Sequence, residues 1–212
     1  MKEGVEIVAD RYTNITYRQF DPSNATRWSM AVAGLLCLPL VLPLIVLAKL
    51  APETGFRTAS EWLSKAPFAW GVILRYQFYR WTLRACGKNV FISFGTVFYY
   101  PQVRIGDNVL IGMYNTIHHC DFGSNVMTAE GCRFLSGSRY HFFDRTDVPM
   151  ARQGGALKRI VVGDDVWVGA NAVVMESIGD GSVVGAGSVV VDPVPPYHVV
   201  AGNPARTIRT RA

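Results

Sequence analysis

One histidine stands in a stretch of the chain that is suited to chemistry. His141 lies in "SGSRYHFFDRTDVPMARQGGALKR", residues 136–159, which lacks the six-residue repeat found on both sides of it. A segment that leaves a regular repeat is expected to loop out, and loops on a rigid scaffold often carry reactive side chains. An imidazole titrates near neutral pH, so it can accept a proton from a weakly nucleophilic hydroxyl. The alternative is a surface histidine that forms only local hydrogen bonds.

Short strands with a six-residue period must hold this loop. Aliphatic residues, several followed by glycine, recur at this spacing before and after the loop. They are Ile105, Ile111, Ile117, Val162, Val168, Ile178, Val184 and Val190. A period of six fits neither an α-helix nor an alternating strand. It predicts a parallel β-helix of roughly five triangular coils, with each aliphatic side chain pointing inward. Val168 and Ile178 are ten residues apart instead of twelve, so we expect a tightened corner at "MESIG".

The C-terminal part of the chain carries a family resemblance. The blocks "GDDVWVGANAVV", "VVGAGSVV" and "VAGNPAR" together resemble the left-handed β-helix hexapeptide-repeat acyltransferases. They are most similar to bacterial sugar O-acetyltransferases of the colanic-acid, capsule and O-antigen type, over about residues 86–210. The resemblance implies a mainly β fold with a left-handed parallel β-helix. It also implies a homotrimer with active sites between subunits and acetyl-CoA as co-substrate.

The same resemblance implies roles for particular residues. His141 takes the place of the general base in a direct transfer without an acyl-enzyme, and Asp144 or a backbone carbonyl orients its ring. Trp167 precedes the inward-facing Val168, so it should point outward, and a large outward aromatic usually has a partner. The resemblance places it beside acetyl-CoA at a subunit boundary. The other residues expected to bind acetyl-CoA are Gly169, Ala186, Gly187, Ser188, Arg206 and Arg209.

Two of these expectations have alternatives, and the acceptor side is less sharply defined. Arg206 and Arg209 suit CoA phosphates, but they can also belong to a solvated tail. The residues expected to contact the acceptor are Asn115, His118, His119 and Gln153. His118 and His119 follow an inward residue and can be plain turn residues. Their spacing from His141 does not resemble the three-histidine metal site of γ-class carbonic anhydrases, so no metal is expected.

The four cysteines fit a reducing compartment. They form no Cys-x-x-Cys pair, and reduced thiols in a cytosolic setting are the expected state. Cys120 and Cys132 have no matched base in the sequence, so a thiol nucleophile is rejected.

An uncharged run near the N-terminus indicates membrane association. Residues 30–48, "MAVAGLLCLPLVLPLIVLA", approach the roughly 20 residues that a helix needs to cross a bilayer. Pro39 and Pro43 slightly favour a re-entrant hairpin over a single span, because prolines bend a helix. The alternative is a buried core helix.

In the next segment, residues 56–86, the sequence predicts short helices on either side of Pro67. Trp70, Tyr76, Phe78, Tyr79 and Trp81 alternate there with Arg75, Arg80 and Arg84. Aromatic and basic residues together suit a membrane interface, although an amphipathic helix packed on its own protein has the same composition. Nucleic-acid binding is not expected, because it does not explain the uncharged run. The basic residues follow that run, which predicts that the coil lies on the cytoplasmic side of the inner membrane.

Three regions result: an unassigned segment 1–28, a helical membrane-associated region 29–86, and a β-helix acyltransferase domain 87–212 with the loop 136–159. The predicted function is acetyl-CoA-dependent O-acetylation of a sugar hydroxyl in a cell-surface polysaccharide or lipid-linked glycan precursor. One alternative is an N-acyltransferase that acts on an amino sugar. Another is a non-catalytic, membrane-bound trimeric scaffold. The sugar and the position of its hydroxyl stay open.

Overall fold

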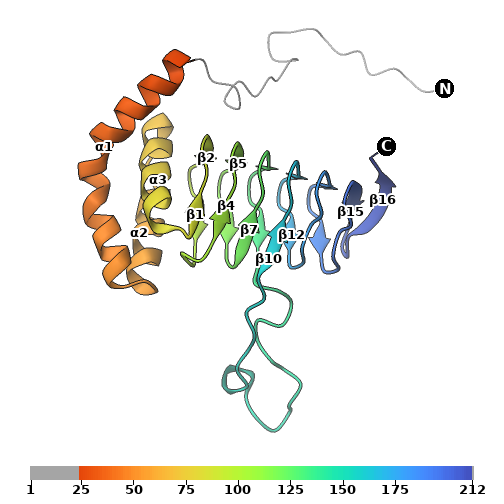
Figure 1. Ribbon diagram of the computed structural model, residues 1–212. Helices are drawn as coiled ribbons and strands as arrows, with labels where there is room; N and C mark the ends of the chain where they lie inside the picture. The colour runs from red at the N-terminus through yellow and green to blue at the C-terminus, as the bar shows by residue number, and fades with distance from the viewer. Residues whose placement is uncertain (1–23, 212) are drawn as a thin grey trace, which may run out of the picture.

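The computed structural model describes residues 24–211, in which three helices cover one end of a β-helix (Figure 1). The helices are α1 (Asn24–Leu50), α2 (Thr54–Ser64) and α3 (Phe68–Thr82). Most of the unassigned segment 1–28 lies outside the described residues. The fold class predicted from the six-residue period, mainly β with a parallel β-helix after a helical region, is confirmed.

The β-helix has three faces, each a sheet of short parallel strands. Sheet A contains β1 (Ala85–Cys86), β4 (Arg104–Ile105), β7 (Cys120–Phe122) and β10 (Ile160–Val162). Sheet B contains β2 (Val90–Ile92), β5 (Val109–Ile111), β8 (Met127–Thr128), β11 (Trp167–Val168), β13 (Val183–Val184), β15 (His198–Ala201) and the antiparallel β16 (Arg206–Thr210). Sheet C contains β3 (Val97–Phe98), β6 (Thr116–Ile117), β9 (Arg133–Phe134), β12 (Val173–Val174) and β14 (Val189–Val190).

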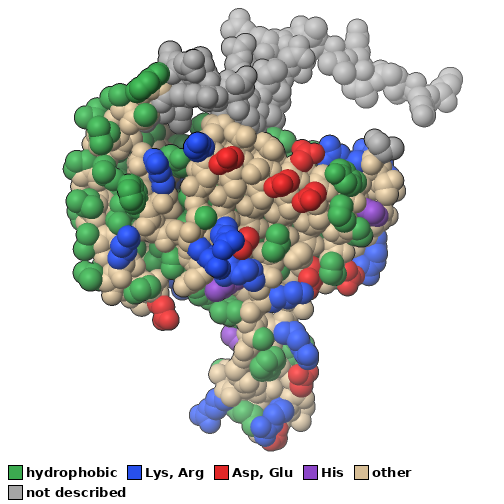
Figure 2. All heavy atoms as spheres, in the orientation of Figure 1, with side chains coloured by type: hydrophobic (Ala, Val, Ile, Leu, Met, Phe, Trp, Pro, Cys, Tyr) green, Lys and Arg blue, Asp and Glu red, His purple; other side chains and the backbone are tan. Residues whose placement is uncertain are grey.

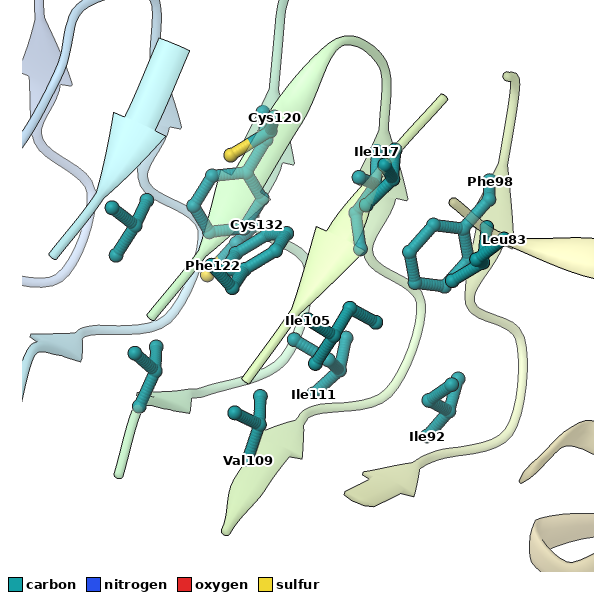
Figure 3. Packing of buried hydrophobic residues seen from close by; sticks show 14 of the residues in the cluster. Leu83, Ile92, Phe98, Ile105, Val109, Ile111, Ile117, Cys120, Phe122 and Cys132 are labelled. Carbon is teal, nitrogen blue, oxygen red and sulfur yellow. The ribbon is translucent and has the colours of Figure 1, made fainter. Parts of the chain in front are cut away.

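The strands form five coils, and a sixth begins with Val194 and β15. The residue at the six-residue period points into the interior from each strand, and several of these residues lie together in Figure 3. The three-residue strands β2, β5, β7 and β10 each bury a second side chain. The sequence pattern did not reveal the third coil. Its inward residues are Phe122, Thr128 and Phe134, which are buried but not aliphatic.

All variation in coil length falls at one corner. Inward residues are six positions apart from sheet A to sheet B and from sheet B to sheet C. At the corner from sheet C to sheet A, the step is seven residues from Phe98 to Ile105, five from Ile117 to Phe122 and four from Val174 to Ile178. The last of these is the predicted tightening at "MESIG". The loop leaves from this same corner, between β9 and β10.

The helix α1 corrects the predicted re-entrant hairpin. It continues through Pro39 and Pro43, both of which lie on its exposed face, and it bows around α2 and α3 (Figure 1). Its buried stripe repeats every three or four residues and packs on α2 and α3. The stripe contains Gly34, Cys37, Val41, Ile45 and Ala48. Tertiary packing along this stripe therefore outweighs the local tendency of proline to break the helix.

Residues on α3 divide between the protein interior and its surface. Arg75, Phe78 and Tyr79 are buried against α2 and the first coil, so their assignment to a membrane interface is wrong. Trp70 and Trp81 are exposed, and so is Arg80. Helical periodicity alone did not show which side of α3 the coil covers.

Candidate active site

The loop 136–159 is held by its own backbone. Its two legs are joined by hydrogen bonds from Lys158 N to Ser136 O at 2.9 Å, from Ala156 N to Arg139 O at 3.0 Å and from Phe142 N to Gly154 O at 2.9 Å. A salt bridge between Lys158 and Glu176 ties the second leg to the coil. The loop is therefore a positioned arm that projects from the coil (Figure 1).

His141 lies on the first leg of this arm and is exposed. Its ring packs edge-on against that of Tyr140, with the centroids 4.8 Å apart. On the other side, Gly155 approaches the same peptide so closely that an added Cβ would lie 1.7 Å from the carbonyl oxygen of Tyr140. Only a glycine permits this contact, so the second leg fixes the backbone that carries His141. Nothing in the sequence pattern around Gly155 indicates this role.

Two residues assigned to the site have other partners. Arg139 Nη2 donates to Asp144 Oδ2 at 3.2 Å, so the Asp144 carboxylate pairs with arginine in this chain and shows no hydrogen bond to His141. Gln153 Nε2 donates to the carbonyl oxygens of Arg145 and Val148 at 2.7 and 2.8 Å. Gln153 therefore closes the tip of the loop, and its use as an acceptor contact would break these bonds.

An aromatic wall stands at the base of the loop. It contains Tyr99, Tyr100, His118, His119 and Tyr140. The rings of Tyr99 and His118 stack with centroids 4.3 Å apart, and those of Tyr100 and His119 are 4.4 Å apart. The hydroxyls of Tyr100 and Tyr140 are 3.2 Å apart, which joins the wall to the leg that carries His141.

Burial changes the titration of this wall. It lowers the pKa of His118 and of His119 below the ordinary value of 6.5, so both imidazoles favour the neutral form. Burial, together with the hydrogen bond to Tyr140, raises the pKa of Tyr100 to about 12. His118 Nδ1 is buried and has no hydrogen-bond partner among the described residues. The wall thus offers flat, neutral rings and one imidazole nitrogen without a protein partner.

Asn115 is a correction to the predicted acceptor contacts. It is 1% exposed, its Nδ2 donates to Thr128 Oγ1 at 2.6 Å, and its Oδ1 accepts from Cys132 N at 2.6 Å. Both ends of the amide are therefore used inside the coil, and Asn115 cannot reach an acceptor. The same burial raises the pKa of the Cys132 thiol to about 11 and that of Cys120 well above 9.0, consistent with the rejection of a thiol nucleophile.

The residues expected to bind acetyl-CoA gather on sheet B and the corner that follows it. Trp167 in β11 is 51% exposed. Ala186 and Gly187 are exposed on the corner between β13 and β14, and a Cβ added at Gly187 would meet nothing within 4 Å. A pantetheine arm fits such an open backbone. Gly169 and Ser188 are buried, and Ser188 Oγ accepts from Gly202 N at 3.2 Å, so these two residues support the corner.

Arg206 and Arg209 are exposed on β16, at the end of the same sheet. Arg206 pairs with Asp192 at 3.1 Å, with both side chains well exposed, so the pair can open at small cost. The backbone corner, Trp167 and these arginines share one side of the coil, which fits a nucleotide thioester in extended form.

The two halves of the predicted site lie at different corners of the same chain. His141 and the aromatic wall stand at the corner from sheet C to sheet A, whereas Gly187 stands at the corner from sheet B to sheet C. One chain does not bring them together. Within residues 24–211, no group of three His, Cys, Asp or Glu side chains is placed to hold a metal.

Comparisons with known proteins agree with the coil and with this chemistry. Residues 159–191 match a family model described as "Hexapeptide repeat of succinyl-transferase". A chloramphenicol acetyltransferase of Agrobacterium fabrum is 37% identical over 115 residues, which cover 50% of this chain and 53% of that relative. The chain thus spans about half the length of the curated relative that it matches.

Two solved structures extend the likeness. A maltose O-acetyltransferase from Clostridium difficile 630 superposes with a TM-score of 0.67 at 24% identity, over 77% of this chain and 88% of that one. A galactoside acetyltransferase in complex with coenzyme A superposes with a TM-score of 0.61 at 25% identity, over 73% of this chain and 80% of that one. The repeat, the coil and these likenesses make the chain similar to the hexapeptide-repeat acetyltransferases.

Proposed function

We propose that this protein is an acetyl-CoA-dependent O-acetyltransferase that acts on a sugar hydroxyl of a membrane-linked glycan. The observation that carries the proposal is the arm 136–159, which presents an exposed imidazole beside an aromatic wall on a coil shared with acetyltransferases. The alternative of a non-catalytic scaffold gives no reason for a glycine fitted against the peptide of His141.

The chemistry needs one proton acceptor at the hydroxyl. As the hydroxyl oxygen attacks the thioester carbonyl, a ring nitrogen of His141 accepts the hydroxyl proton. The carbon–sulfur bond then breaks, the acetyl group remains on the oxygen, and His141 returns the proton to the sulfur. Acid–base assistance of this kind contributes about 10²–10⁴-fold to the rate. Cys120 and Cys132 take no part, because both thiols are buried and protonated.

A homotrimer completes the site in this proposal. In one chain His141 and Gly187 stand at different corners of the triangular coil. When three coils pack side by side with parallel axes, the arm of one subunit can face the open corner of the next. The trimer therefore supplies a reason for a projecting arm that meets no acetyl-CoA residue of its own chain.

Flat rings support a sugar acceptor. A pyranose presents a face of C–H bonds that packs on aromatic side chains, and Tyr100 and Tyr140 lie beside the arm with such rings. The Tyr99 ring is already covered by His118 and by the Arg57 guanidinium. The relatives named above carry three different acceptors in their names, so the donor half of the reaction is better supported than the acceptor. Chloramphenicol is the second candidate acceptor, because a relative of that name is 37% identical.

Membrane attachment is proposed from the outer face of α1. Val32, Leu35, Leu36, Leu40 and Leu50 are exposed on it, and Figure 2 shows hydrophobic side chains gathered over this end of the molecule. Among the described helices α1 is the one that is long and apolar enough to cross a bilayer. However, its buried stripe is fixed to α2 and α3, which carry charged residues. We therefore propose that α1 lies in the plane of the cytoplasmic leaflet, and not across the membrane.

An acceptor panel tests the proposed activity. The full chain in detergent is mixed with acetyl-CoA, and thiol release is followed with a maltoside, a galactoside, chloramphenicol, an amino sugar and lipid-linked glycans extracted from bacterial membranes. Acceptor-dependent thiol release with an O-acetyl sugar product supports the proposal. An N-acetyl product would show that the acceptor is an amino sugar, and thiol release with chloramphenicol alone would show that chloramphenicol is the acceptor. If no acceptor increases thiol release, the non-catalytic scaffold is favoured.

A further inference from the structure

A groove lies between α1, α3 and the first two coils, on a side of the molecule that the proposed reaction does not use. Its volume is about 660 Å³. Leu35 and Leu38 line it from α1, and Ile73 and Trp81 line it from α3. The groove has an apolar inner wall and is open at one side, as expected of a site that binds a hydrocarbon chain.

Two cations stand at the rim of this groove. Arg80 and Lys88 both line it and are exposed, and neither has an acidic partner within ion-pair distance among the described residues. Asp107 also lines the groove, but its Oδ1 accepts the backbone N–H of Lys88 at 2.7 Å, so it is engaged in the corner of the coil. The ionised groups of the lining therefore sum to a positive charge.

The groove is continuous with the outer face of α1. Leu35 lines the groove and is also 70% exposed, and its neighbour Leu36 is 72% exposed on the face proposed to meet the membrane. Figure 2 shows Lys and Arg side chains between the hydrophobic surface over α1 and the coil. Apolar lining, a cationic rim and continuity with a hydrophobic face together match an anionic phospholipid.

We propose that this groove binds one anionic phospholipid of the membrane, with an acyl chain between α1 and α3 and its phosphate at Arg80 and Lys88. The inference rests on the membrane attachment proposed above and is independent of acetyl transfer. Such a lipid would lock the helical end of the molecule to the leaflet at one fixed point.

Lipid binding to the purified full chain tests this proposal. The protein is delipidated in detergent and titrated with dioleoyl phosphatidylglycerol, with dioleoylglycerol, which lacks the phosphate, and with inorganic phosphate, and native mass spectrometry counts the adducts. We expect one phosphatidylglycerol per chain and little retention of the other two probes. Retention of phosphatidylglycerol and dioleoylglycerol to the same extent, or of none, overturns the proposal.

Matched variants locate the site. Ala31→Trp fills the groove and should abolish the adduct, whereas Val32→Trp on the adjacent exposed position should leave it. Arg80→Gln and Lys88→Gln should each weaken binding about fivefold, as expected for one cation near an anionic lipid. Arg84→Gln, which is exposed but outside the groove, should have no effect. Equal effects of the members of either pair would contradict the site.

A photoreactive residue identifies the occupant. With p-benzoylphenylalanine in place of Leu35, illumination in phosphatidylglycerol vesicles should give an adduct with the mass of one lipid. A crosslink to a peptide of the same chain or of a second copy would show another occupant and overturn the proposal. If the protein still floats with vesicles but retains no lipid, only the groove assignment fails and the membrane attachment stands.

Discussion

The Arg75 guanidinium in α3 donates from Nε to the backbone carbonyl of Ile92 in the first coil, at 2.7 Å. Its Nη1 donates to the carbonyls of Leu63 and Ala66, at 3.0 and 2.8 Å, where α2 ends. Arg75 is 1% exposed, so water cannot replace it. One side chain thus joins the three-helix end to the coil and caps α2.

Arg75→Met should destabilise this junction. The change removes the side-chain donor from the carbonyls of Ile92, Leu63 and Ala66, of which Leu63 keeps a bond from Ala66 N, and we expect a loss on the order of 3 kcal/mol in the free energy of unfolding. Thermal unfolding in detergent, followed by circular dichroism, measures it. Arg80→Met, on the exposed side of the same helix, should change stability by less than about 0.5 kcal/mol. Equal effects of the two variants would show that Arg75 does not hold the junction.

His141→Ala should lower turnover by about 10²- to 10⁴-fold, because no other proton acceptor would stand at the acceptor hydroxyl. The oligomeric state and the affinity for acetyl-CoA should survive, since His141 is exposed and its ring packs on that of Tyr140. Thiol release and calorimetric binding of acetyl-CoA separate these effects. His198→Ala is the matched control, because His198 Nδ1 lies 2.8 Å from the Pro196 carbonyl, far from the arm. Near-normal turnover of the His141 variant would remove the proposed base.

Trp167→Ala should raise the KM for acetyl-CoA more than it lowers turnover, since Trp167 is half exposed on the proposed donor side. Mixing offers a sharper check of the shared site. When His141→Ala and Trp167→Ala subunits are combined in equal amounts, about a quarter of the boundaries in random trimers regain both native residues. Activity at low acetyl-CoA should recover accordingly. An active monomer, or mixtures that show no recovery, would refute a site between subunits.

Mild acid should destabilise the protein through His118 and His119. The folded protein lowers the pKa of both below 6.5, so the unfolded chain binds more protons as the pH falls. Their contribution to stability is therefore complete above pH 6.5 and is lost as the pH falls through the lowered values. The double variant His118→Gln and His119→Gln should lose less stability in acid than the native protein, when the free energy of unfolding is measured from pH 7.5 to 4.5. The control His198→Gln should show the same pH dependence of stability as the native protein. An unchanged pH dependence in the double variant would contradict the assignment to His118 and His119.

Leu36→Glu combined with Leu40→Glu should release the protein from membranes. Both side chains are exposed on α1, at 72% and 59%, so the change removes apolar contact without disturbing the buried stripe. Fractionation of cells and flotation with vesicles measure attachment. High salt alone should not release the native protein, because apolar contact outweighs the basic residues. A native protein that stays in the supernatant, or that salt removes, would contradict attachment through α1.

The sequence predicted the coil well because its interior is repetitive. Each inward position between Ile105 and Ile117, and again from Val162 onward, holds an aliphatic residue, so the period is visible without the structure. The third coil was missed because Phe122, Thr128 and Phe134 fill the same interior with different shapes. The arm was recognisable as an interruption, but its internal bonds were not. Gln153 was therefore predicted to contact the acceptor, whereas its side chain closes the tip of the loop.

Residues other than the inward aliphatic ones were predicted less well, since their environment depends on neighbours far along the chain. Asn115 was expected to contact the acceptor, yet it binds Thr128 and Cys132 of the third coil. Arg75 fits an interfacial pattern, but the first coil covers its side of α3. Pro39 and Pro43 suggested a bend, and the packing of α1 on two other helices kept the segment in one piece.

Because α1 lies at one end of the stack, the number of coils sets the distance between α1 and the arm. Neighbouring strands in a sheet lie about 4.8 Å apart, so the arm, which leaves after the third coil, stands roughly 10 Å beyond the first coil. In the proposed attachment, α1 rests on a leaflet and the number of coils sets the height of His141 above it. Removing one coil would then lower His141 by about 5 Å without changing a reacting side chain. Under this proposal, the distance from the bilayer to the reaction depends on the number of repeats.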